Sequence, residues 1–264
     1  MIAETAMYLA LFFSQSKYLA ETSRLMDRLN KDGYKEVVEI VKDQRFRLFD
    51  PSALRKKANK VDLTDPKKHR YMTDESIQKS LDFIEKQKEW LDKAEELFPD
   101  IKREHIAAVL NIESYFGKNM GSYPAINALF SSYVFTERKD LFYEYITELL
   151  KFAGKNDIKD IFQLTGSFDG GMTPAQLMPT NLRKYAYDLD GDGFELNGIE
   201  DAIGSCGNML HDKRKGGDIL QALNAYNGAK YANAVNLHAQ RLMERLSPPL
   251  TRKPPVVRKI PTKN

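Results

Sequence analysis

The chain has 264 residues, of which 42% are hydrophobic and 29% charged, a composition typical of a folded protein with its own apolar core. Its 40 basic and 37 acidic residues leave a net charge of +3, which is too small to indicate a nucleic-acid partner. The single cysteine, Cys206, excludes an intrachain disulfide framework and is interpreted as a small buried hydrophobic residue.

The N-terminal residues form an amphipathic pattern rather than a membrane span. No run approaches the roughly 20 apolar residues that a transmembrane helix needs. The apolar stretch from Ala6 to Phe13 follows Glu4, where a signal peptide would carry basic residues, so we interpret it as a helix that continues toward Leu29. A truncated start and secretion both stay open. Residues 61–72 are read as a polar linker.

Most of the remaining chain shows helical spacing with little strand-type alternation, which predicts an all-α fold. Thr73 or Asp74 is placed to cap a long amphipathic helix that ends before Pro99. A shorter helix is expected to start at Thr173-Pro174, with threonine as the cap and proline in the first turn. Further helices are predicted at residues 125–135, 137–152, 157–164, 199–211, 217–226 and 229–246.

The stretch Glu104 to Gly121, EHIAAVLNIESYFGKNMG, is the first candidate for chemistry. Glu113 falls seven residues after Ile106 on one helical face, and the other members of that face are apolar. Burial disfavours the charged form of a carboxyl group, so the pattern predicts a raised pKa and a group able to act as a general acid. Gly117 offers an exit for the helix. The alternative is a carboxylate paired with a neighbouring Lys or Arg.

The acidic stretch from Asp188 to Gly193, DLDGDG, is the second candidate. Aspartates at positions 1, 3 and 5 and glycine at position 6 reproduce the first half of an EF-hand loop, whose oxygen ligands suit calcium. Position 12, normally a bidentate glutamate, is Ile199, so the closing carboxylate is expected from Glu200 or Asp201. The sequence predicts a structural calcium site, with a metal-free acidic turn as the alternative.

Four blocks of sequence resemble the membrane-bound lytic murein transglycosylase B family, in the family's order. They are NIESYFGKNMGSYPAINAL, GSFDGGMTPAQLMPTNLRKYAYDLDGDG, EDAIGS and LNAYNGAKYANAV. The resemblance implies a lysozyme-like helical domain that cleaves the β-1,4 bond between N-acetylmuramic acid and N-acetylglucosamine in peptidoglycan. Its product would carry a 1,6-anhydro ring on the muramic acid. The predicted organisation is an N-terminal helical extension (1–72), the transglycosylase domain (73–246) and a basic, Pro-rich disordered tail (247–264).

The resemblance also implies roles for individual residues. Glu113 matches the family's single catalytic group, which acts first as acid and then as base. Polar residues that match the lining of the glycan cleft are Ser167, Gln176, Tyr226 and Asn227. Tyr115 is placed to stack on a sugar ring. The implied calcium ligands are Asp188, Asp190, Asp192, the carbonyl of Phe194 and Asp201.

Departures from the family pattern keep other functions open. Thr173-Pro174 stands where the family has a small or aromatic pair, which motivates a glycan-binding scaffold without turnover. A hydrolytic muramidase would need a second carboxylate about 5 to 9.5 Å from Glu113, and Asp169 is the candidate. The expected partner is peptidoglycan, without nucleic acid, and the expected state is a monomer. The expected location is the bacterial cell envelope, periplasmic or extracellular.

Overall fold

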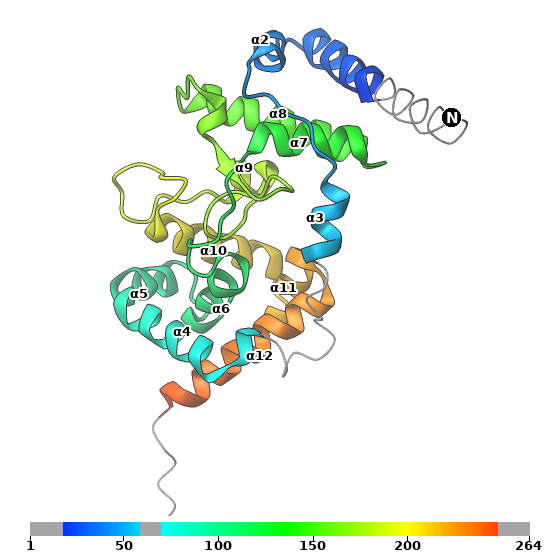
Figure 1. Ribbon diagram of the computed structural model, residues 1–264. Coiled ribbons are helices and arrows are strands. Elements are labelled where there is room, and N and C mark those ends of the chain that lie inside the picture. The colour runs from blue at the N-terminus through cyan, green and yellow to red at the C-terminus, as the bar shows by residue number, and fades with distance from the viewer. Residues whose placement is uncertain (1–17, 59–69, 248–264) are drawn as a thin grey trace, which may run out of the picture.

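A computed structural model describes residues 18–58 and 70–247 (Figure 1). The apolar stretch from Ala6 to Phe13, most of the 61–72 linker and nearly all of the basic tail lie outside these residues. Within them, no helix is both long and apolar enough to cross a membrane.

Helices make up nearly all of the regular structure, as the periodicity predicts. An unlabelled helix covers residues 18–31. The remaining elements are α2 (Val37–Lys42), α3 (Pro51–Ala58), η2 (Arg70–Met72), α4 (Asp74–Lys86), α5 (Lys88–Leu97), α6 (Arg103–Ser114), β1 (Tyr123–Pro124), α7 (Ala125–Phe135), α8 (Lys139–Lys155), η3 (Ile161–Gln163), β2 (Thr165–Gly166), α9 (Pro179–Tyr185), α10 (Ile199–Arg214), α11 (Ile219–Asn227) and α12 (Ala229–Leu246). β1 and β2 form a short antiparallel pair in which Tyr123 lies opposite Gly166.

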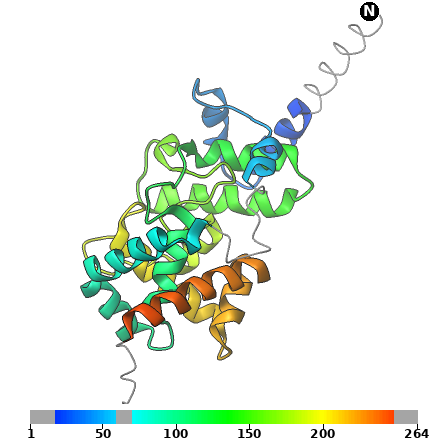
Figure 2. The same ribbon diagram turned by 60° about the horizontal axis from the view of Figure 1, so that its bottom comes forward.

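The helices gather at two ends of the molecule (Figure 1). At one end, α7 packs on α8, the helix of residues 18–31 and α2 lie over them, and α3 extends from α7 toward α11; at the other end α6 packs against α4 and α12. α9 and α10 connect the two ends, because α9 contacts both α8 and α10. Turning the molecule shows α12 crossing the helices at this second end, with α11 folded back beside it (Figure 2).

The stretch between α2 and α3 forms hydrogen bonds with α7. The Asn127 side chain donates to the carbonyl of Arg45 over 2.9 Å, and the Phe49 amide donates to the Ser131 hydroxyl over 3.1 Å. These contacts bring α3 alongside α7, which places α3 at the edge of the site described below. The boundary proposed at residue 72 stays a prediction.

Two details of the predicted helices are wrong. The helix expected from residue 73 to Phe98 is two helices, because Gln87 leaves helical geometry with φ −101° and ψ 25°. Thr73 caps the first of them, its side chain accepting from the Ser76 amide over 3.2 Å. The stretch 157–164 contains only the single turn η3, which Asp160 caps.

The helix expected at Thr173-Pro174 is also absent, and α9 begins instead at Pro179. Thr173 and Gln176 have φ of 66° and 51°, values incompatible with a right-handed helix. They close a tight loop between Met172 and Leu177, which form an isolated antiparallel bridge. Both prolines satisfy the rule for a first helical turn, so local sequence could not choose between them.

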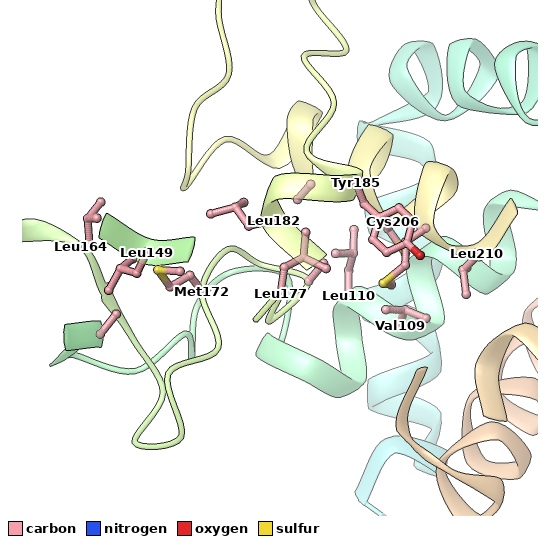
Figure 3. Close-up of a cluster of buried hydrophobic side chains, with 14 of the residues drawn as sticks. Val109, Leu110, Leu149, Leu164, Met172, Leu177, Leu182, Tyr185, Cys206 and Leu210 are labelled. Atoms are coloured by element: carbon pink, nitrogen blue, oxygen red, sulfur yellow. The ribbon is translucent and has the colours of Figure 1, made fainter. Parts of the chain in front are cut away.

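The buried core runs from the end of α8 to α6 and α10 (Figure 3). Leu149, Leu177, Leu110 and Leu210 lie along this cluster and are fully buried. Cys206 belongs to the same cluster, where burial raises the pKa of its thiol above the usual range. It is the small buried residue that the sequence indicated.

Candidate active site

The helix that carries Glu113 ends in an unusual left-handed turn. Tyr115, Phe116 and Gly117 have φ of 53°, 57° and 83°, so the helix leaves right-handed geometry two residues before the predicted glycine. The turn is held by Ser114, whose hydroxyl donates to the Pro174 carbonyl over 2.6 Å and accepts from the Gly117 amide over 2.8 Å. Non-glycine residues in this region store strain that tertiary contacts must offset, and such strain clusters at functional sites.

Glu113 lies one residue before Ser114 and lines a cleft of about 580 Å³. Its side chain reaches the cleft, whereas Oε1 is buried and has no hydrogen-bond partner among the described residues. Burial raises the pKa of Glu113 to about 7, and polar groups of Tyr231, Tyr226 and Asn227 limit the rise. The direction is the one predicted from the apolar helical face. A carboxyl group with this pKa exchanges its proton readily near neutral pH.

Ser167 and Gln176 line the same cleft from a single loop. The Ser167 hydroxyl accepts from the Gly171 amide over 3.0 Å. The Gln176 side-chain amide donates to the carbonyls of Met120 and Thr173, each over 3.2 Å. A β-carbon on Gly171 would lie 3.2 Å from both Ser167 Oγ and Gln176 Oε1, so glycine permits the close packing of these two polar groups.

The Tyr226–Asn227 pair reaches the cleft from the end of α11. The Tyr226 hydroxyl donates to the Ala175 carbonyl, which ties α11 to the loop that carries Gln176. Tyr231, at the start of α12, packs edge-on against Tyr226 with ring centroids 5.4 Å apart. Its hydroxyl is buried near Glu113. Tyr231 was not among the predicted site residues, and its place in the motif LNAYNGAKYANAV was the available signal.

Tyr115 lies on the other side of Glu113, in a second hollow of about 280 Å³. We call this the second hollow; its walls come from η2, α4, α6 and the turn after α6. Its lining residues are Arg70, Tyr71, Thr73, Glu75, Ser76, Lys79, Asn111, Ile112, Glu113, Ser114, Tyr115 and Asn119. Lys79 and Lys118 each place Nζ 5.1 Å from the Tyr115 ring centre. Glu113 thus stands between two concave surfaces.

Further cleft residues escaped the sequence analysis because they come from other parts of the fold. Arg55 of α3 donates two hydrogen bonds to Asp169 Oδ1, from Nε over 2.8 Å and from Nη2 over 2.5 Å. Arg138 and Tyr145 line the same cleft from the start of α8, and Asn181 does so from α9. No spacing rule links these residues to Glu113, so only the tertiary packing places them there.

The acidic loop lies between α9 and α10, away from the Glu113 cleft. Asp188, Asp190 and Asp201 can each bring one carboxylate oxygen within 4.8 Å of the others. Asp201 is only 2% exposed, and its two oxygens accept from the amides of Leu189 (2.9 Å) and Glu195 (2.6 Å). Burial raises the pKa of Asp201, and these two amides oppose the rise. Asp188 accepts in the same way from the amides of Gly191 and Gly193.

One predicted loop ligand, Asp192, lies outside this group, and the predicted role of the Phe194 carbonyl stays a prediction. Asp192 is not one of the three converging carboxylates, and a hydrogen bond with Asp190 raises its pKa. Phe194 packs its ring on Phe152 of α8 at 6.4 Å, which anchors the loop to the core. The backbone amides that point at Asp188 and Asp201 give the loop the internal order expected of a curled oxygen-rich site.

Comparison with known proteins places the chain among transglycosylases. The family described as "Transglycosylase SLT domain" matches residues 23–253. The chain belongs to this family. It is 29% identical over 143 residues to membrane-bound lytic murein transglycosylase B of Escherichia coli strain K12. That match covers 53% of this chain and 39% of the relative, so it spans well under half of the relative's length.

Solved structures share the fold of this transglycosylase-family chain at low sequence identity. The Escherichia coli lytic transglycosylase SLT35 in complex with calcium has a TM-score of 0.71 at 19% identity, covering 85% of this chain and 93% of that chain. SltB3 from Pseudomonas aeruginosa in complex with NAG-anhNAM-pentapeptide has a TM-score of 0.70 at 16% identity, covering 86% and 79%. These likenesses confirm the predicted all-α, lysozyme-like fold.

Proposed function

We propose that this chain is a peptidoglycan lytic transglycosylase, which cleaves the bond between N-acetylmuramic acid and N-acetylglucosamine and leaves a 1,6-anhydro end. One observation carries the proposal. Glu113, with a pKa of about 7, lines a cleft together with Ser167, Gln176, Tyr226 and Asn227. Membership of the transglycosylase family and the names of its relatives support the same reaction.

In the first step, protonated Glu113 would give its proton to the glycosidic oxygen as the bond breaks. The positive charge that develops on the muramic acid ring can be met by the substrate's own N-acetyl oxygen. A buried carboxyl group suits this step because its surroundings favour the neutral form, whose proton is available for transfer.

In the second step, the Glu113 carboxylate would take the proton from the 6-hydroxyl of muramic acid as that oxygen attacks the anomeric carbon. The attacking group is already part of the substrate, which supplies the proximity that an outside water lacks. The polar groups of Tyr231 and Asn227 favour the carboxylate that exists between the two steps. The single acid therefore returns to its starting form without a second catalytic carboxylate.

The pairing of Asp169 supports transfer over hydrolysis. Asp169 shares the cleft with Glu113, but Arg55 donates two hydrogen bonds to one of its oxygens. Oδ1 of Asp169 is therefore already occupied by two donors and is less available to accept a proton from a water molecule. The hydrolytic alternative, in which Asp169 activates water, is therefore disfavoured.

We propose that the acidic loop binds a structural calcium ion, and its residues fit that role. Three carboxylates converge, and backbone amides preorganise two of them. Asp188, Asp190 and Asp201 would supply the first oxygens, with Asp192 and the Phe194 carbonyl completing the set. The calcium complex of the Escherichia coli relative supports the choice of cation. The ion would neutralise clustered negative charge between α9 and α10.

The proposed substrate places the protein in the bacterial cell envelope, with peptidoglycan strands as its partner. A relative is named membrane-bound, and another is solved with a peptidoglycan fragment. The monomeric state expected from the sequence remains part of this proposal.

Digestion of purified sacculi, with product masses measured, tests the activity. The expected products end in 1,6-anhydromuramic acid, one water lighter than reducing ends. Reducing ends would instead identify a hydrolytic muramidase, and binding of sacculi without any released product would identify a scaffold. Glu113→Gln protein serves as the control for contaminating enzymes.

A further inference from the structure

A chain of buried polar groups connects the helix of Glu113 to the short helix η2. His238, on α12, is fully buried. Its Nε2 lies 2.9 Å from the Ser80 hydroxyl of α4, and its Nδ1 lies 2.7 Å from the Tyr71 carbonyl of η2. Asn111 of α6 donates from its side-chain nitrogen to the same Ser80 hydroxyl over 2.9 Å and to the Ser76 hydroxyl over 3.0 Å.

The direction of these hydrogen bonds is set by the carbonyl at one end. A carbonyl can only accept, so Nδ1 of His238 carries the hydrogen that it donates to Tyr71. In the neutral ring, Nε2 is then the acceptor, and the Ser80 hydroxyl donates to it. Burial lowers the pKa of His238 to about 4, opposed by the hydrogen bond to Tyr71, so the neutral ring is the form present near pH 7.

This arrangement matters for the site because η2 forms a wall of the second hollow. Arg70 and Tyr71 line the hollow, as do Ser76 and Asn111 of the hydrogen-bonded chain. The carbonyl that His238 holds belongs to Tyr71 itself. Glu113 borders the same hollow, so a displacement of η2 would alter the surface next to the proposed acid without touching the acid.

An apolar residue at position 238 would fill the same space without the cost of burying an imidazole. We therefore interpret the role of these hydrogen bonds as geometric. A buried hydrogen-bonded network specifies one arrangement of the elements that it joins. Here those elements are α4, α6, α12 and η2.

We propose that His238 is a positioning residue, which seats η2 through its Nδ1–H and thereby shapes the second hollow for glycan binding. This inference rests on the proposed glycan-cleaving function. It assigns His238 no contact with substrate and no part in proton transfer.

Two substitutions at position 238 test the contributions of the two ring nitrogens separately. In His238→Asn, the side-chain amide nitrogen can occupy the position of Nδ1 and keep the donation to Tyr71, while the Ser80 partner is lost. In His238→Gln, the longer side chain can accept from Ser80, while the donation to Tyr71 is lost. Ser80→Ala removes the hydroxyl that donates to Nε2 and leaves His238 in place. His211→Gln is the matched control, because His211 is a half-exposed histidine paired with Asp100.

We expect His238→Gln to raise KM for soluble glycan strands about 3- to 10-fold with kcat within twofold, the loss typical of one hydrogen bond that aids binding. His238→Asn, Ser80→Ala and His211→Gln should keep KM within twofold. Hydrogen–deuterium exchange of residues 70–76 should accelerate in the Gln variant and not in the Asn variant. The pH dependence of kcat should be the same in all four variants, because Glu113 is untouched.

Equal KM values in the Asn and Gln variants would overturn the proposal, as would faster exchange at residues 70–76 without a change in KM. If the Gln variant does not fold, the exchange of residues 70–76 in His238→Asn and Ser80→Ala decides, and acceleration in either one contradicts the assignment to Nδ1. Failure of the proposed function would look different. Wild-type protein would then release no sugar product, while the exchange data would still report whether His238 seats η2.

Discussion

Two regions of this molecule contain a buried carboxyl group, and they differ in the hydrogen-bond partners that surround it. Glu113 lines the cleft, and one of its oxygens is buried and unpaired among the described residues. Asp201 is also buried, yet both of its oxygens accept backbone amides and two further aspartates converge on it. Burial raises the pKa of both groups, that of Glu113 to about 7, and at Asp201 the two backbone amides oppose the rise.

The difference shows how the partners of a buried carboxyl group decide its use. Where burial outweighs the hydrogen-bond donors nearby, the group prefers to hold a proton and can transfer it. Where backbone amides orient several carboxylates at one point, the charge is retained and a cation is the natural partner. The same functional group, a carboxyl, would thus act as an acid in one place and as a metal ligand in the other.

The largest effect is expected from Glu113→Gln. Loss of the proton donor and acceptor should lower kcat about 10² to 10⁴-fold, the usual contribution of a positioned acid and base. Release of anhydro-ended fragments from sacculi, followed over time, measures the change. A variant that retained wild-type turnover would remove Glu113 from the mechanism.

The same substitution should stabilise the protein at neutral and alkaline pH. The folded pKa of Glu113 is about 7 against an ordinary value of 4.5, so the folded state binds a proton more tightly than the unfolded state does. Wild-type stability therefore declines as pH rises from 4.5 through 7. Above pH 7 the free energy of unfolding of Glu113→Gln should exceed that of the wild type by about 3 kcal/mol, because each unit of difference between the folded and unfolded pKa contributes about 1.36 kcal/mol. Urea unfolding at pH 4 and pH 8 checks this, since the two proteins should agree at the lower pH.

Asp201→Asn tests the proposed calcium site in the acidic loop. Calcium at 100 times its Kd should stabilise the wild-type protein by about 2.7 kcal/mol, which raises Tm by roughly 5 to 10 °C for a chain of this size. The variant should lose most of this increase, and a chelator should lower Tm only in the wild type. Equal calcium shifts in both proteins would show that the loop is not the site.

Tyr231→Phe tests the effect of the Tyr231 hydroxyl on the pKa of Glu113. The hydroxyl of Tyr231 lowers the pKa of Glu113 by favouring its carboxylate, so its removal should raise that pKa further. The pKa that Glu113 contributes to the dependence of kcat on pH should move upward by about 0.4 to 1 unit, the equivalent of one hydrogen bond. A shift to lower pH would contradict this role for the hydroxyl.

Asp192→Asn should have the smallest effect. Asp192 lies outside the group of three converging carboxylates, and Asp190 raises its pKa by a hydrogen bond. The variant should retain more of the calcium-induced rise in Tm than Asp201→Asn does. Thermal unfolding of both variants, with calcium and with chelator, ranks the two positions.

Local patterns anticipated much of the fold and the centre of the site. Helical spacing located α6, α7 and α10 to α12, because an apolar face with a period of 3.6 residues is visible without tertiary information. Glu113 stood out for the same reason, as a carboxyl group on such a face. Where two prolines both satisfied the rule for a first turn, the pattern chose Pro174 and the chain uses Pro179.

Sequence alone determined that the chain is helical, that one glutamate interrupts an apolar face and that an acidic loop separates two helices. Only the tertiary structure decided that Arg55 engages Asp169, that Tyr231 faces Glu113 and that His238 holds Tyr71. The physical reason is the range of the interactions. Periodicity and capping act within a few residues, whereas burial and hydrogen-bond partners come from segments brought together by packing the whole chain.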